Sequence, residues 1–141
     1  MSGSRNPGFK RAGAVAAGLA AIFILSMGTD AALHAAGIFP PPGERMSDAL
    51  FALATAYRAA FGILGCWLAA RLAPDHPARH AWALAGIGLL FSIGGAIAMG
   101  KMGPLWYSLA IIAMNPLCAW AGARLADREP SRHPNPIPRS A

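Results

Sequence analysis

The fold is decided by residues 12–45, which read AGAVAAGLAAIFILSMGTDAALHAAGIFPPPGER. Residues 12–39 are apolar apart from Asp30, His34 and a few small hydroxyls, and a helix of about 20 such residues crosses the hydrocarbon core of a bilayer. The prolines at 40–42 then stop any helix, because proline lacks the amide donor and clashes with the preceding turn. The pattern predicts a first membrane span over residues 12–39. A cleaved signal peptide is the alternative, but this apolar run is long for one.

The same pattern of an apolar run between turn residues returns three times along the chain. Further spans are expected over about 48–72, 77–99 and 104–126. Turns rich in proline and glycine separate them. The sequence therefore predicts an all-α polytopic membrane protein, a four-transmembrane-helix antiparallel bundle. A single membrane domain would cover residues 12–126, between a polar segment at residues 1–11 and a proline-rich tail at 127–141 that is expected to be disordered.

The composition agrees with a lipid environment. Of the 141 residues, 55% are hydrophobic and only 13% are charged, whereas soluble domains carry about 25% charged residues. The net charge of +6 does not indicate nucleic acid, because the basic residues flank apolar runs and form no patch interleaved with aromatics. The lipid bilayer is the expected partner. Cys66 and Cys118 both fall in expected spans and are interpreted as small apolar side chains.

The distribution of Lys and Arg predicts the orientation in the membrane. Nine of them lie in the N-terminal segment, the middle turn and the C-terminal end, against two, Arg45 and Lys101, on the opposite side. Cytoplasmic loops retain positive charge. Both termini are therefore expected in the cytoplasm.

Two ionisable residues lie inside expected spans, where such groups are costly and usually face a bundle interior. They are Asp30 and Arg58. In an antiparallel hairpin that turns near residue 44, positions whose numbers sum to about 88 lie opposite each other, and 30 and 58 satisfy this condition. At about 1.5 Å per residue, each lies roughly 13 to 15 Å from the outer end of its span. The two side chains are expected to meet near mid-membrane.

The third and fourth spans each place a polar side chain at about the same depth. Residues three and four apart share a helix face, which adds neighbours on the first two spans. The predicted buried polar layer comprises Asp30, Arg58, Ser92, Asn115, His34 and Thr55. Two interpretations stay open. The layer fixes which helices pair and in what register, or it lines a small cavity that binds an ion, a proton or a polar solute.

Motifs for chemistry are not found. No serine, cysteine or threonine has a histidine base at a spacing typical of nucleophilic catalysis, so no catalytic residue is predicted and an enzyme is not expected. His76 and His80 are four apart, but two imidazoles with Pro77 between them do not make a metal site. These two histidines lie at the inner boundary of the membrane, so His34 is the only histidine deep inside a span, which disfavours haem held between facing helices. No metal or cofactor is expected.

Four short segments carry a resemblance: GTDAALH at 28–34, FPP at 39–41, MSDAL at 46–50 and TAYR at 55–58. They resemble a group of short four-span proteins of the bacterial inner membrane. The resemblance implies topology and a multi-pass location in the bacterial inner (plasma) membrane, and it implies no activity.

Two functions are weighed for such a chain. The sequence slightly favours a non-enzymatic structural or accessory protein that packs against a membrane-protein partner or forms a homo-oligomer, because abundant alanine and glycine give smooth helix surfaces. The alternative is a small solute or ion carrier or channel that uses the Asp30/Arg58 layer.

Overall fold

The computed structural model describes residues 6–129, which form four long helices and one short 3-10 turn. The elements are α1 (Pro7–Ala35), α2 (Asp48–Leu72), α3 (Pro77–Met99), η1 (Gly100–Met102) and α4 (Leu105–Arg128). This part of the chain contains no strand. Each of the four helices is long and apolar enough to cross a membrane. The all-α, four-helix prediction is confirmed.

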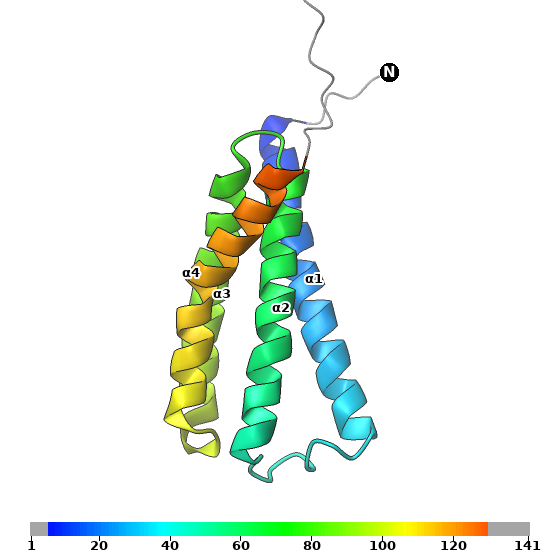
Figure 1. Cartoon of the computed structure of the whole chain (residues 1–141), viewed down its shortest axis with the longest axis vertical. Coiled ribbons are helices and arrows are strands. Elements are labelled where there is room, and N and C mark those ends of the chain that lie inside the picture. Colours follow the sequence, from blue (N-terminus) through cyan, green and yellow to red (C-terminus); the bar gives the residue numbers. More distant parts are fainter. Residues whose placement is uncertain (1–5, 130–141) are drawn as a thin grey trace, which may run out of the picture.

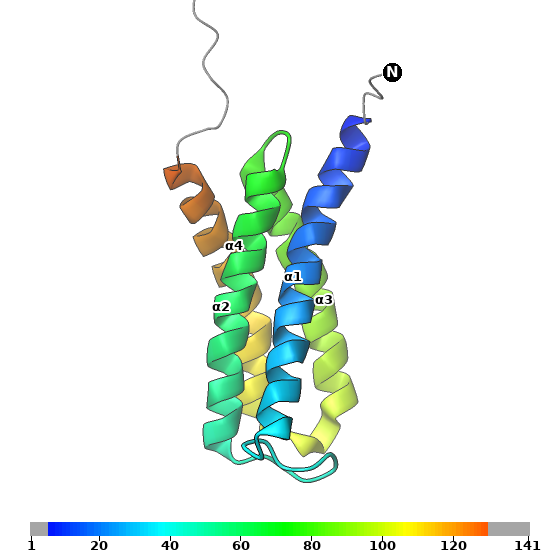
Figure 2. The same cartoon turned by 90° about the vertical axis from the view of Figure 1, so that its right-hand side faces the viewer.

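The helices run up and down as an antiparallel bundle (Figures 1 and 2). The start of α1 and the end of α4 lie at one end, here called the terminal end, and residues 36–47, which connect α1 to α2, lie at the other, the loop end. α2 packs against α1, α4 and, less closely, α3, and α3 packs against α4. The contact between α1 and α3 is slight. The α1–α3 side is therefore the loosest seam of the bundle.

The second and third helices have the predicted bounds because strong local signals set their starts. Ser47 caps α2, since its Oγ accepts the amide of Leu50 at 3.4 Å. His76 adopts a left-handed conformation (φ 41°) directly before α3, and Pro77 fills the first helical position. Proline is favoured there because the first amides of a helix have no acceptor within it.

The first helix differs from its prediction at both ends. It begins at Pro7 and ends at Ala35, whereas the expected span covered residues 12–39. Gly37 (φ 70°) ends it, because Ile38 N donates to Leu33 O and Gly37 N to His34 O, both at 3.0 Å. This is a Schellman motif, which closes a helix with a left-handed glycine. The prediction that this helix continues to residue 39 was wrong, because it took the prolines at 40–42 as the point where the helix ends.

The last helix also extends slightly further than expected, to Arg128, where 126 was predicted. Its C-terminal half leans across the bundle in Figure 1. Pro116 lies inside this helix and interrupts its hydrogen bonding, a common cause of a bend. The tail predicted to be disordered lies from residue 130 onward outside the described residues.

Glycines allow the backbones to approach closely at two crossings. A Cβ on Gly18 of α1 would lie 2.5 Å from the carbonyl oxygen of Gly65 on α2, and a Cβ on Gly65 would lie 2.8 Å from that of Gly18. On α4, a Cβ at Gly122 would lie 2.6 Å from the backbone nitrogen of Trp67. Only glycine fits such contacts, which are typical of membrane helix pairs.

Two clusters of buried side chains close the ends of the bundle. At the terminal end, Cys66, Ala69 and Leu84 belong to one cluster. At the loop end, Phe51 and Tyr107 belong to the other, with ring centroids 4.8 Å apart. The middle of the bundle, between the two clusters, holds the polar side chains.

Candidate functional site

The first polar group joins α1 to α2 in the middle of the bundle. Arg58 Nη2 donates to Asp30 Oδ2 at 2.7 Å, and the hydroxyl of Tyr57 donates to Asp30 Oδ1. The contact expected between Asp30 and Arg58 is therefore present. The Nε of Arg58 is buried and has no hydrogen-bond partner among the described residues. An acceptor supplied from the bundle interior would complete the hydrogen bonding of this guanidinium.

The second polar group joins α3 to α4. Asn115 Nδ2 donates to Ser92 Oγ at 3.0 Å, to Ile111 O at 2.9 Å and, at longer range, to Ile112 O at 3.4 Å. The two carbonyls near this nitrogen fix the orientation of the amide, since neither could donate to an oxygen placed there. Pro116 has no amide to donate to Ile112 O, so Asn115 supplies a partial replacement.

The six residues predicted as one layer therefore lie in two groups and two local contacts. Ser92 Oγ donates to Gly88 O at 2.8 Å and stays on the α3–α4 side. Thr55 Oγ1 donates to Phe51 O of its own helix at 2.9 Å. Exposed His34 bonds through Nδ1 to Asp30 O at 2.8 Å and contacts the ring of Phe39 edge-on. Among the described residues, no hydrogen bond links the α1–α2 group to the α3–α4 group.

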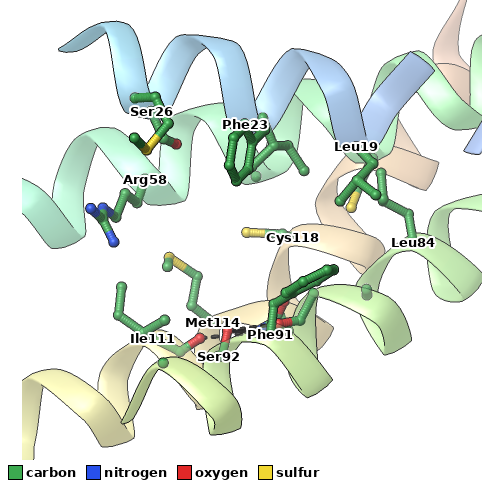
Figure 3. A pocket seen from close by; sticks show the side chains of 18 of the residues that line it. Leu19, Phe23, Ser26, Arg58, Leu84, Phe91, Ser92, Ile111, Met114 and Cys118 are labelled. Atoms are coloured by element: carbon green, nitrogen blue, oxygen red, sulfur yellow. Dashed lines mark hydrogen bonds between the residues drawn. The ribbon is translucent and has the colours of Figure 1, made fainter. Parts of the chain in front are cut away.

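A cavity of about 700 Å³ lies between the two polar groups. Arg58 lines it from one side and Ser92 from the other (Figure 3). Asn115, which is bonded to Ser92, also lines it. Most of its wall is apolar, and the side chains labelled there include Leu19, Phe23, Leu84, Phe91, Ile111 and Met114. Ligand pockets in proteins have volumes of about 300 to 1,000 Å³ and show the same mixture of an apolar wall with few polar groups.

The cavity opens sideways between α1 and α3. Phe23 and Met27 on α1 and Phe91 on α3 line it and are also exposed on the outside of the bundle. These two helices make less contact than the other neighbouring pairs of long helices. In a membrane this opening faces hydrocarbon, so a molecule that enters through it must dissolve in lipid.

The charges at the cavity nearly cancel. The guanidinium of Arg58 is neutralised by the carboxylate of Asp30, with which it forms a salt bridge. The α3–α4 group is uncharged. The wall thus favours a ligand with a mainly apolar body and a single polar group that accepts hydrogen bonds.

The part of the chain that the structure describes contains no group of three or more His, Cys, Asp or Glu side chains that could hold a metal ion. The Nδ1 atom of His80 lies 3.2 Å from the backbone oxygen of His76, so this ring nitrogen already has a hydrogen-bond partner.

Comparisons with family models, with curated proteins and with solved structures find no match for this chain. The class that the fold itself defines is a membrane protein with four candidate spanning helices. Its particular function has to be inferred from the cavity and the two polar groups.

Gly88 tests the geometry of the α3–α4 group. A Cβ at this position would lie 2.4 Å from Asn115 Oδ1, so Gly88→Ala forces the amide to rotate away from its acceptors. We expect a loss of about 1 to 3 kcal/mol in the free energy of unfolding. Gly94→Ala, on the same helix with nothing within 4 Å, is the matched control. Equal melting temperatures of the two variants in detergent would contradict the assigned Asn115 contacts.

Proposed function

We propose that this chain is a non-enzymatic membrane protein of the small-carrier type, which binds a lipid-soluble molecule bearing one polar group between its four helices. The cavity of about 700 Å³ that reaches Arg58 and Asn115 and opens between α1 and α3 is the observation that carries this proposal. The ligand must be soluble in lipid because the cavity opens sideways into the membrane. It should carry a single polar group because the wall is apolar apart from the two polar groups described above.

The size of the cavity favours ligand binding over a purely structural layer. Lost packing contacts around unfilled space cost free energy, and a space of about 700 Å³ is far larger than the voids found in close-packed protein interiors. A layer that only fixed helix register would be better served by close packing. An occupant drawn from the membrane, either a lipid chain or a solute, removes this cost.

The location is part of the same proposal: the inner membrane of a bacterium, with both termini in the cytoplasm. The excess of Lys and Arg on the side of the termini supports this orientation. The resemblance to short four-span inner-membrane proteins supports the compartment.

An accessory role with a membrane-protein partner is the second candidate. Gly86 and Gly94 of α3 are exposed and have open space around them. Membrane helices approach one another closely at such small residues. A partner helix or a second copy of the chain could therefore pack there.

Two neighbouring glycines of α3 allow a sharp test of the cavity. A Cβ at Gly94 or at Gly95 meets nothing within 4 Å, but only Gly95 lines the cavity. The probe is a photoactivatable fatty acid carrying a diazirine at mid-chain, applied to the protein in phosphatidylcholine nanodiscs. We expect Gly95→Phe to reduce labelling of Met114 and Ile111 about tenfold, equivalent to about 1.4 kcal/mol of binding free energy.

The control variant is Gly94→Phe, which adds the same ring on the same turn outside the cavity and should label like the parent. Peptide mass spectrometry measures the labelling at each site. Unchanged labelling in Gly95→Phe, or an equal reduction in both variants, would contradict ligand binding in the cavity and would favour the accessory role.

A further inference from the structure

A second hollow lies on the same α1–α3 seam, at the terminal end of the bundle. Its volume is about 590 Å³. Arg11 and Val15 line it from α1, and Arg79, His80 and Ala83 line it from α3. We call it the terminal groove. Ala16 lines both this groove and the cavity, so the two follow one another along the seam.

The depth of the terminal groove matches a lipid headgroup above a lipid chain. α1 has 29 residues, and at 1.5 Å per residue it is about 43 Å long, against a hydrocarbon core of about 30 Å. Its first turns, with Arg11, therefore extend into the headgroup region. Arg79 lies in the first turn of α3 at the same end. Val15 and Ala83 lie one turn deeper, where acyl chains begin.

The charges at the mouth of the terminal groove leave one cation free to bind an anion. Arg11 Nε donates to Asp75 Oδ1 at 3.1 Å, and this hydrogen bond lowers the pKa of Asp75, so the carboxylate stays ionised and offsets Arg11. Exposed Arg79 forms no salt bridge with any described residue. The first turn of α3 has no acidic residue, and the start of a helix attracts negative charge.

From these features we infer that the terminal groove binds an acidic phospholipid, with its phosphate at Arg79 and an acyl chain between Val15 and Ala83. A lipid is favoured over a free anion because the floor beneath the arginines is apolar. Basic pockets between membrane helices at the headgroup level hold such lipids. The inference does not depend on the cavity having a ligand.

The test compares dioleoylphosphatidylglycerol with dioleoylphosphatidylcholine, which share acyl chains and differ in charge. Protein in detergent is incubated with each lipid, and retained lipid is counted by native mass spectrometry. We expect the parent to retain phosphatidylglycerol in preference. Arg79→Gln should lower its retention about fivefold, because one arginine near a charged membrane surface contributes about 1 kcal/mol.

Three further arms separate this site from its alternatives. Arg128→Gln removes the charge of an exposed arginine at the end of α4, away from the groove. This variant should retain lipid like the parent. Ala83→Trp keeps both arginines but fills the apolar floor at an exposed position, and should abolish the preference. Inorganic phosphate at millimolar concentration should not displace the lipid.

Several results would overturn the inference. Equal retention of the two lipids by the parent, an equal loss in Arg79→Gln and Arg128→Gln, or unchanged retention in Ala83→Trp would each do so. Displacement by inorganic phosphate would assign the site to a free anion. Gly95→Phe, which alters only the cavity, should leave phosphatidylglycerol retention unchanged, so failure here is distinguishable from failure of the proposed function.

Discussion

Replacing Arg58 by alanine is expected to lower the free energy of unfolding by about 3 to 5 kcal/mol, because the half-buried ion pair lies at mid-membrane, away from water, where removing one partner costs about as much as in a protein interior. Asp30 then loses the guanidinium at 2.7 Å and keeps only the hydroxyl of Tyr57. A carboxylate in a membrane interior without a cation must take up a proton or reach water, and either loosens the contact between α1 and α2. Asp30→Ala has a similar effect, since it leaves the cation unpaired.

The double variant Asp30→Leu/Arg58→Met distinguishes a pair from two independent residues. Replacing both charges with apolar side chains of similar volume is often close to neutral, so this variant should recover most of the loss. Unfolding in detergent micelles, followed by circular dichroism, measures all three proteins. Simple addition of the two single effects would show that the residues do not interact.

Gly122→Ala is expected to destabilise the protein by about 2 kcal/mol or more, because added volume at a tight contact forces the backbone to move. The new methyl group would lie 2.6 Å from the backbone nitrogen of Trp67 and 2.8 Å from the carbonyl carbon of Cys66. Backbone atoms cannot rotate away as a flexible side chain can. α4 must therefore shift away from α2, which opens the cluster at the terminal end.

Gly86→Ala is the matched control for this prediction. It makes the same change within α3 where nothing lies within 4 Å, and alanine is favoured over glycine in a helix by up to about 1 kcal/mol. Its unfolding midpoint should equal or exceed that of the parent. If Gly122→Ala unfolds at the same denaturant concentration as Gly86→Ala, α2 and α4 are not in contact at this glycine.

The helix bounds were predictable where a single residue type decides them. Ser47 and Pro77 set the starts of α2 and α3 through a side-chain cap and a first-turn proline. The end of α1 was mispredicted because Gly37 closes the helix through backbone bonds. An earlier stop could have been inferred from a glycine just after an apolar run, which is a common helix ending.

The candidate site was predictable only along the membrane normal. Counting residues from the hairpin turn placed Asp30 and Arg58 at the same depth. Because one connection joins their two helices as neighbours, the two side chains could be expected to meet. For Ser92 and Asn115 the same count gave depth but not lateral distance, so two separate groups were taken for one layer. The separation depends on how far α1 stands from α3, which no local pattern encodes.

Tyr57 was missed because its neighbour Arg58 already occupied the expected face. Adjacent residues on a helix point about 100° apart, yet the tyrosine ring is long enough for its hydroxyl to reach Asp30. A tyrosine beside a charged residue at mid-span is the signal that could have found it. The cavity had no such signal, since it arises from the splay of whole helices.

The central claim, that four helices cross the membrane and leave both ends of the chain on one side, is tested most directly by reporter fusions. Alkaline phosphatase or green fluorescent protein is inserted within residues 40–45, within 73–76 or after Ala126, and activity is measured in bacterial cells. The account predicts phosphatase activity only at 40–45 and fluorescence at both other positions. Phosphatase activity after Ala126, or fluorescence at 40–45, would contradict it.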